Sequence, residues 1–96
     1  MMPSVEWETP QDFFRTLDKE FHFTLDVCAT NKNAKCSHYF SIHENGLLQR
    51  WTGTCWMNPP FNKSMSKWMA KAWESAQEGT TVIALNCPGL GFILVA

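Results

Sequence analysis

Hydrophobic residues recur at helical spacing between residues 64 and 78. The members of this stripe are Met65, Trp68, Met69, Ala72, Trp73 and Ala76. Apolar positions three or four residues apart lie on one face of a helix, so we expect a helix from about Ser64 to Glu78 that buries the whole stripe. Gly79 stands where a left-handed helix cap belongs, which marks the end of this helix.

Apolar segments on both sides of this helix predict two strands. In residues 54–57, Cys55 and Met57 are expected on one face of a short strand and Trp56 on the other. Residues 80–85 are rich in β-branched side chains and end in four apolar residues, which favours a second strand. Strand, helix and strand in this order form a βαβ unit with parallel strands. We therefore predict an α/β fold that binds ligands at the carboxyl ends of its strands.

The amino-terminal half of the chain predicts one more helix and one more strand. Thr9 and Pro10 supply a capping hydroxyl and a proline at the first helical position, and Asp12 follows in the first turn. Hydrophobic residues then alternate with polar ones over residues 21–27, which predicts a strand with His22 facing solvent. Residues 31–50 are polar and poorly periodic, so we expect a loop-rich connection with one short strand or helical turn at most.

The tetrapeptide Asn58-Pro59-Pro60-Phe61 follows the first strand of the βαβ unit. Asn58 offers an amide oxygen, the two prolines hold a stiff turn with free carbonyls, and Phe61 offers a flat apolar face. A planar amine could donate to the Asn58 oxygen and the Pro59 carbonyl while its ring stacks on Phe61, which would expose its nitrogen lone pair to an electrophile. An ordinary Asn-Pro turn is the simpler alternative.

Charged residues near these elements have two interpretations each. Asp26, near the carboxyl end of its predicted strand, could accept hydrogen bonds from ribose hydroxyls or lie beside a cationic group, or it could cap the following loop. Lys63, Lys67 and Lys71 follow one another at intervals of four residues at the start of a helix. They could bind a phosphate, although an ordinary solvated helix face is favoured because Glu74 and Glu78 continue the same surface.

Composition narrows the class of protein. The 96 residues, of which 45% are hydrophobic, suffice for a single small domain. A net charge of -1 gives no global attraction to nucleic acid, so any DNA contact must come from a local patch. No apolar run has transmembrane length and the amino terminus does not resemble a secretion signal, so we expect a cytoplasmic protein without membrane association.

The four cysteines are expected to be free thiols, because they show no close pairing and a reducing compartment is expected. An alternative is a small zinc-binding module. Its ligands would be Cys28, Cys36, His38 and His43.

Several segments together resemble the phage-type DNA N-6-adenine methyltransferases, and they occur in the order found in that family. The match covers about residues 5–85. It is carried by residues 7–11, 23–30, 33–36, 39–40, 46–47, Trp51 and 56–61.

The resemblance implies a function. It implies a partial Rossmann-like fold in three αβα layers and S-adenosylmethionine as methyl donor, with no metal. It also implies site-specific transfer of a methyl group to the N6 amine of an adenine flipped out of double-stranded DNA. Enzymes of this kind occur in phages, prophages and restriction-modification systems, which places the protein in the cytoplasm of a bacterial host.

The resemblance also assigns residues to roles. The catalytic tetrapeptide corresponds to Asn58, Pro59, Pro60 and Phe61, and Lys63 and Lys67 are candidate DNA-binding residues beside it. The cofactor-binding residues would be Thr9, Pro10, Asp26, Cys28 and Ala29.

The chain departs from the family pattern in three places. Phe61 replaces the commoner tyrosine, which keeps the stacking face, and Ala29 is followed by Thr30 rather than by a glycine-rich turn. Residues 86–96 form an atypical tail where the family continues into further strands and helices. We therefore expect residues 1–96 to be a single, incomplete methyltransferase domain, with a non-catalytic remnant as the alternative. The apolar end of the tail would be an exposed strand unless it pairs with the sheet.

Overall fold

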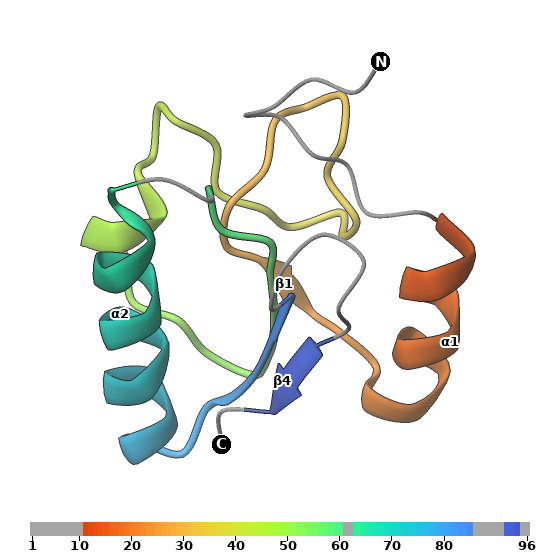
Figure 1. Ribbon diagram of the computed structural model, residues 1–96. Helices are drawn as coiled ribbons and strands as arrows, with labels where there is room; N and C mark the ends of the chain where they lie inside the picture. Colours follow the sequence, from red (N-terminus) through yellow and green to blue (C-terminus); the bar gives the residue numbers. More distant parts are fainter. Residues whose placement is uncertain (1–10, 61–62, 86–91, 95–96) are drawn as a thin grey trace.

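The computed structural model describes residues 11–60, 63–85 and 92–94. Helices and short strands follow one another along these residues, and the last two elements are both strands (Figure 1). In chain order the elements are α1 (Gln11–Phe21), β1 (Leu25–Asp26), the 3-10 helix η1 (Gly46–Leu48), β2 (Thr54–Met57), α2 (Met65–Gln77), β3 (Thr81–Leu85) and β4 (Phe92–Leu94).

The strands form one sheet in the order β1-β2-β3-β4. The pairs β1-β2 and β2-β3 are parallel, whereas β4 pairs antiparallel with β3. This arrangement confirms the α/β class and the parallel βαβ unit that the sequence predicts for residues 54–85. Gly79 has φ 97°, as expected for a left-handed cap after α2. The apolar end of the tail supplies β4 and therefore pairs with the sheet.

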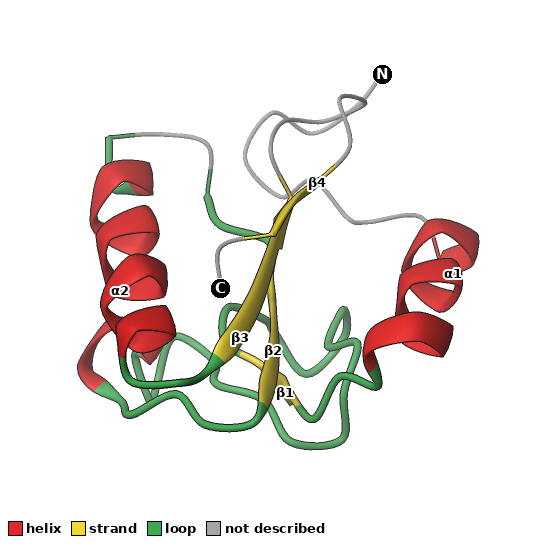
Figure 2. Cartoon of the chain, turned by 90° about the horizontal axis from the view of Figure 1, so that it is seen from below, coloured by secondary structure: helices red, strands yellow, loops and turns green. Residues whose placement is uncertain are grey.

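The two helices cover opposite faces of the sheet (Figure 2), and each face has its own hydrophobic cluster. Cys55 and Met57 of β2 point toward the α2 face and Trp56 toward the α1 face, which confirms the predicted alternation. The α2-face cluster contains Leu25, Val27, Trp51, Cys55, Met57, Trp68, Ala72, Val82 and Ala84. The α1-face cluster contains Phe14, Leu17, Trp56, Ile83 and Leu85.

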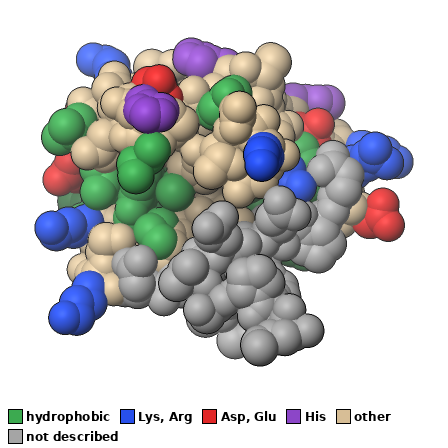
Figure 3. Space-filling model, turned by 90° about the horizontal axis from the view of Figure 1, so that it is seen from above, with side chains coloured by type: hydrophobic (Ala, Val, Ile, Leu, Met, Phe, Trp, Pro, Cys, Tyr) green, Lys and Arg blue, Asp and Glu red, His purple; other side chains and the backbone are tan. Residues whose placement is uncertain are grey.

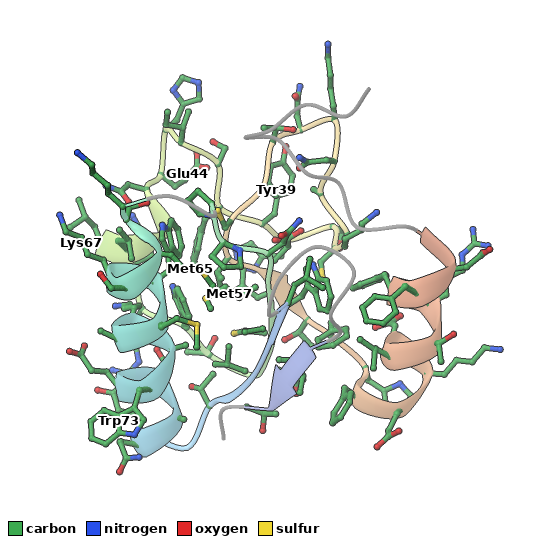
Figure 4. The ribbon with its side chains drawn as sticks, in the orientation of Figure 1. Tyr39, Glu44, Met57, Met65, Lys67 and Trp73 are labelled. Carbon is green, nitrogen blue, oxygen red and sulfur yellow. The ribbon has the colours of Figure 1, made fainter. Side chains whose placement is uncertain are left out.

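Trp73 corrects the predicted buried stripe of α2. Its side chain is 61% exposed and points away from the sheet (Figure 4), and the buried residues of the helix are Trp68, Ala72 and Ser75. Trp73 lies five positions after Trp68, which places the two side chains about 140° apart around a helix with 3.6 residues per turn. The predicted stripe was therefore wider than the face that the sheet covers.

The predicted strand over residues 21–27 is also wrong in its extent. Helix α1 continues through Phe21, His22 follows with φ 56°, and the strand is limited to Leu25–Asp26. His22 is exposed as expected, but it lies in a turn. The Asp18 carboxylate closes this turn by accepting a hydrogen bond from the Phe23 backbone N–H at 2.9 Å. A helix end followed by a turn thus produces the same alternation as a strand.

Candidate functional site

The carboxyl ends of β1 and β2 open onto a cavity of about 520 Å³. This volume lies in the range of small-molecule sites, about 300–1,000 Å³. Figure 3 looks onto this end of the molecule, where hydrophobic side chains gather at the surface. The cavity is lined by Cys28, Ala29, Thr30, Asn33, Phe40, Ser41, Ile42, Asn45, Gly46, Leu47, Asn58, Pro59, Pro60, Ser64 and Trp68.

The first wall is the loop after β1, which Asp26 holds in place. One carboxylate oxygen of Asp26 accepts from the Cys28 backbone N–H at 3.2 Å, and the other accepts from the Lys35 N–H at 2.9 Å. The Asp26 side chain is buried and is not among the residues lining the cavity. This is the loop-capping geometry that the sequence left open, and it fixes the backbone that carries Cys28 and Ala29 along the cavity.

Burial controls the protonation of this wall. Removal from water raises the pKa of Asp26 to about 6, against the lowering effect of the two backbone hydrogen bonds and of the nearby Lys35 charge. Burial also raises the pKa of Cys28 to about 12, and the neighbouring Asp26 charge adds to this effect. Cys36 and Cys55 are likewise free thiols whose pKa values burial raises to about 12.

The second wall is formed within residues 40–47, which belong to the segment that the sequence predicted to be a loop-rich connection. Phe40 is fixed beside β1, because its N–H donates to the Asp26 carbonyl at 2.9 Å and its carbonyl accepts from the Ala29 N–H at 3.0 Å. Asn45 caps η1 with φ 56° and its side-chain oxygen accepts from the Leu47 N–H. The signal in the sequence was the Asn45-Gly46 pair, a common turn former.

Gly46 allows this second wall to lie close to the sheet. A Cβ atom at Gly46 would stand 2.1 Å from the Val27 carbonyl oxygen and 3.1 Å from the ring of Trp68. The Gly46 carbonyl also accepts a hydrogen bond from the Trp51 indole N–H at 2.8 Å. The backbone of η1 therefore packs directly against the α2-face core, which only a residue without a side chain permits.

The third wall contains three of the four tetrapeptide residues together with the start of α2. Asn58, Pro59 and Pro60 follow β2 and line the same cavity as Cys28 and Ala29. Trp68 of α2 completes this wall, and its ring stacks on Trp51 with centroids 6.1 Å apart. Sequence reasoning did not identify Phe40, Asn45 or Trp68 as site residues. Thr9, Pro10 and Phe61 lie outside the described residues.

The lysines beside the tetrapeptide are not part of the cavity wall. Lys63 and Lys67 are exposed, and the Lys67 side chain points away from the sheet (Figure 4). Lys71 is half-buried, with its ammonium 6.0 Å from the centre of the Trp51 ring. The first two lysines are therefore available to an external anion at the rim, whereas Lys71 interacts with the core.

The zinc-module alternative receives no support. In the described ranges, no three His, Cys, Asp or Glu side chains gather into a group that could hold a metal ion. Cys28 belongs to the cavity wall, and His38 and His43 are exposed. Among the helices that the structure describes, none has both the length and the apolar character needed to cross a membrane.

Comparison with known proteins shows which family the chain belongs to. Residues 4–88 match the family model described as DNA N-6-adenine-methyltransferase (Dam). The chain is 32% identical over 82 residues to the DNA N-6-adenine-methyltransferase of Haemophilus phage HP1 (strain HP1c1), covering 82% of this chain and 47% of the relative. It is 31% identical over 64 residues to YfdM of Escherichia coli (strain K12), which is named provisionally as a methyltransferase, covering 58% of this chain and 70% of YfdM. The chain thus spans about half the length of the phage relative, and it belongs to the DNA N-6-adenine-methyltransferase (Dam) family.

Proposed function

We propose that this chain carries the cofactor- and adenine-binding part of a site-specific, S-adenosylmethionine-dependent DNA N6-adenine methyltransferase with a Rossmann-like fold. One observation carries the proposal. The loop after β1, with Cys28 and Ala29, and the tetrapeptide residues Asn58, Pro59 and Pro60 line one cavity. A donor held by the first group and an acceptor amine held by the second would therefore meet in the same space.

The residues of the cavity suit the cofactor. The lining contains both amide or hydroxyl side chains and apolar ones, and its described part contains no lysine or arginine that would repel a cationic ligand. S-adenosylmethionine would supply an electrophilic methyl group. Cys28 and Ala29 would hold it along the first wall, Asp26 would keep that wall in shape, and Thr9 and Pro10 would complete the site.

The tetrapeptide would position the amine of adenine. The Asn58 side-chain oxygen and the Pro59 carbonyl accept hydrogen bonds from the two amine hydrogens, so the nitrogen lone pair points toward the donor. Positive charge develops on this nitrogen during the reaction, and the two carbonyl dipoles stabilise it. The proton can then leave to water, so no strong base is required. Phe61 would stack on the adenine ring.

The substrate would be double-stranded DNA with the target adenine flipped into the cavity. Flipping costs a few kcal/mol, and stacking and hydrogen bonding in the pocket offset this cost. Lys63 and Lys67 at the rim would contact phosphates beside the flipped base. Such an enzyme would act in the cytoplasm of a bacterial host that carries a phage or prophage.

The test combines calorimetric binding of S-adenosylmethionine with transfer of labelled methyl groups to duplex DNA, followed by nucleoside analysis. Asn58→Ala is expected to reduce turnover by at least about 10²-fold, the usual loss when one preorganised charge-stabilising partner is removed. Phe61→Ala should lose stacking worth about 1–3 kcal/mol, whereas Phe61→Tyr should be nearly neutral. Label on cytosine, or full activity in Asn58→Ala, would exclude the assignment.

A further inference from the structure

The rim of the cavity carries an isoleucine that is almost fully in water. Ile42 is 87% exposed, although it is also one of the residues that line the cavity. Exposing a large aliphatic side chain at a site edge forgoes the free energy of burying it. Leu48 is similarly exposed at 78%, but it does not line the cavity. Leu48 is therefore a control for Ile42, because both side chains are exposed but only Ile42 lies at the cavity.

The loop that presents Ile42 is held by hydrogen bonds on both sides of it. The Ser41 backbone N–H and hydroxyl both donate to one Glu44 carboxylate oxygen at 2.7 Å. The Asn45 N–H donates to the Ser41 carbonyl at 3.0 Å, and the Gln49 side chain donates to the Glu44 carbonyl at 2.7 Å. Ile42 thus sits at the tip of a braced turn, and holding it there requires little additional ordering when a partner binds.

The loop that carries Ile42 and the start of α2 differ in charge, which limits the contacts that each can make with DNA. Residues 41–45 contain no lysine or arginine, and the hydrogen bonds from Ser41 lower the pKa of Glu44, which is therefore anionic near neutral pH. Such a loop offers neither a lysine nor an arginine to a phosphate, so Ile42 supplies an apolar contact at its tip. The cations Lys63 and Lys67 are instead sequence neighbours of Ser64, which precedes α2, and of Trp68 in α2, and both of these residues line the cavity. Figure 4 shows Glu44 in the loop and Lys67 on the helix. The cavity therefore has basic residues near one wall and an apolar tip on another.

We propose that Ile42 is a wedge that enters the base stack of DNA next to the adenine as that base leaves the duplex. The proposal rests on the function proposed above. Apolar side chains such as isoleucine, inserted between base steps, unstack them, and the buried apolar area offsets part of the cost. Because Ile42 lies at the rim of the cavity proposed to bind the adenine, it would unstack the DNA at the position from which that adenine is flipped.

The test measures base unstacking directly. Genomic DNA fragments are copied with 2-aminopurine in place of part of the adenine, so no target sequence has to be known. This analogue fluoresces when it is unstacked. Saturating wild-type protein is expected to raise the emission of the duplex. Ile42→Ala should reduce this rise by at least about fivefold, the scale expected when burial of most of an isoleucine side chain is lost. Leu48→Ala and the conservative Ile42→Leu should retain it.

Fluorescence anisotropy of the same DNA separates binding from unstacking. Wild type, Ile42→Ala, Ile42→Leu and Leu48→Ala are expected to bind the single-stranded copy with equal affinity, since a single strand has no base pairs to open. An equal rise in emission for Ile42→Ala and wild type, an equal loss in Leu48→Ala, or duplex binding by wild type with no rise would overturn the wedge. If wild type does not bind duplex DNA at all, the proposed DNA substrate fails and the wedge fails with it, whereas calorimetry still tests cofactor binding separately.

Discussion

Both faces of the sheet are covered by a cluster of buried hydrophobic side chains, but only the cluster on the α2 face also contributes to the cavity wall. On the α1 face, the rings of Phe14 and Trp56 meet edge to face at 5.3 Å, and none of the five buried residues of that cluster lines the cavity. On the α2 face, Trp68 belongs both to the core and to the cavity wall. Substitutions on the α1 face should therefore change stability alone, whereas substitutions on the α2 face should change stability and ligand binding together.

Trp56→Ala should have the largest effect on stability. Trp56 is fully buried and packs against Phe14 and Phe23, so truncating it leaves a large cavity in a small core. We expect a loss of about 3–5 kcal/mol in the free energy of unfolding, measured with urea. The dissociation constant of S-adenosylmethionine, measured by calorimetry and corrected for the folded fraction, should not change. A weaker intrinsic affinity would show that the α1 face also shapes the site.

Asp26 should make stability depend on pH. Its pKa is about 6 in the folded chain and 3.8 in the reference state, so the folded chain holds the proton more strongly. The resulting stabilisation is complete below pH 3.8 and is lost as pH rises through 6, which removes about 2–3 kcal/mol between about pH 4 and 7.

The control for this prediction is Asp26→Asn, which cannot titrate. One backbone N–H would then face an amide nitrogen instead of an oxygen, so the variant should be less stable at low pH. The difference between the two pH profiles of unfolding free energy isolates the titration. Parallel profiles would show that Asp26 has an ordinary pKa.

Gly46→Ala probes the contact between η1 and the α2-face core. The new Cβ would overlap the Val27 carbonyl, so the backbone of η1 must shift, at a cost of about 1–3 kcal/mol. Because Gly46 also lines the cavity, the affinity for S-adenosylmethionine should fall as well. Urea unfolding and calorimetry on the same variant measure both effects. Loss of stability with unchanged affinity would contradict the link between the α2-face core and the site.

Trp73→Ala should have the smallest effect. The side chain is 61% exposed on the outer surface of α2, so the free energy of unfolding should change by less than about 0.5 kcal/mol, and cofactor affinity should stay constant. A change above about 1 kcal/mol would reveal a contact for this ring. The variant also serves as a matched control for tryptophan removal, because it leaves both cores intact.

The part of the fold that the sequence predicted depends on local patterns. The βαβ unit could be recognised because the period of α2 and the alternation of Cys55, Trp56 and Met57 each follow from residues close together in the chain. The strand at 21–27 was overextended because Phe21, the last residue of α1, and Phe23, just after the helix, both pack against the α1-face cluster. An alternating pattern indicates which side chains are buried, but it does not show the backbone conformation. A helix end followed by a turn can bury the same side chains as a strand.

The site was predictable only where it follows strand ends. Cys28 and Ala29 follow β1 within three residues and Asn58 comes directly after β2, so the parallel pairing of these strands brings them to one edge. The wall formed by residues 40–47 depends on hydrogen bonds between Phe40 and the β1 region, which are not local in sequence. No periodicity in a polar loop indicates such a contact. Trp68 was recognised as a core residue, but its second role depends on where that wall lies.

The protonated thiol of Cys28 has a consequence for chemical selectivity. A thiolate is a strong nucleophile, and a thiolate on the cavity wall would compete with an amine for an electrophilic methyl group and alkylate the protein itself. With its pKa raised to about 12, Cys28 stays neutral at physiological pH and reacts poorly. The same burial that packs the first wall therefore protects it, and a site proposed for methyl transfer can carry a sulfur on its surface without consuming its own donor.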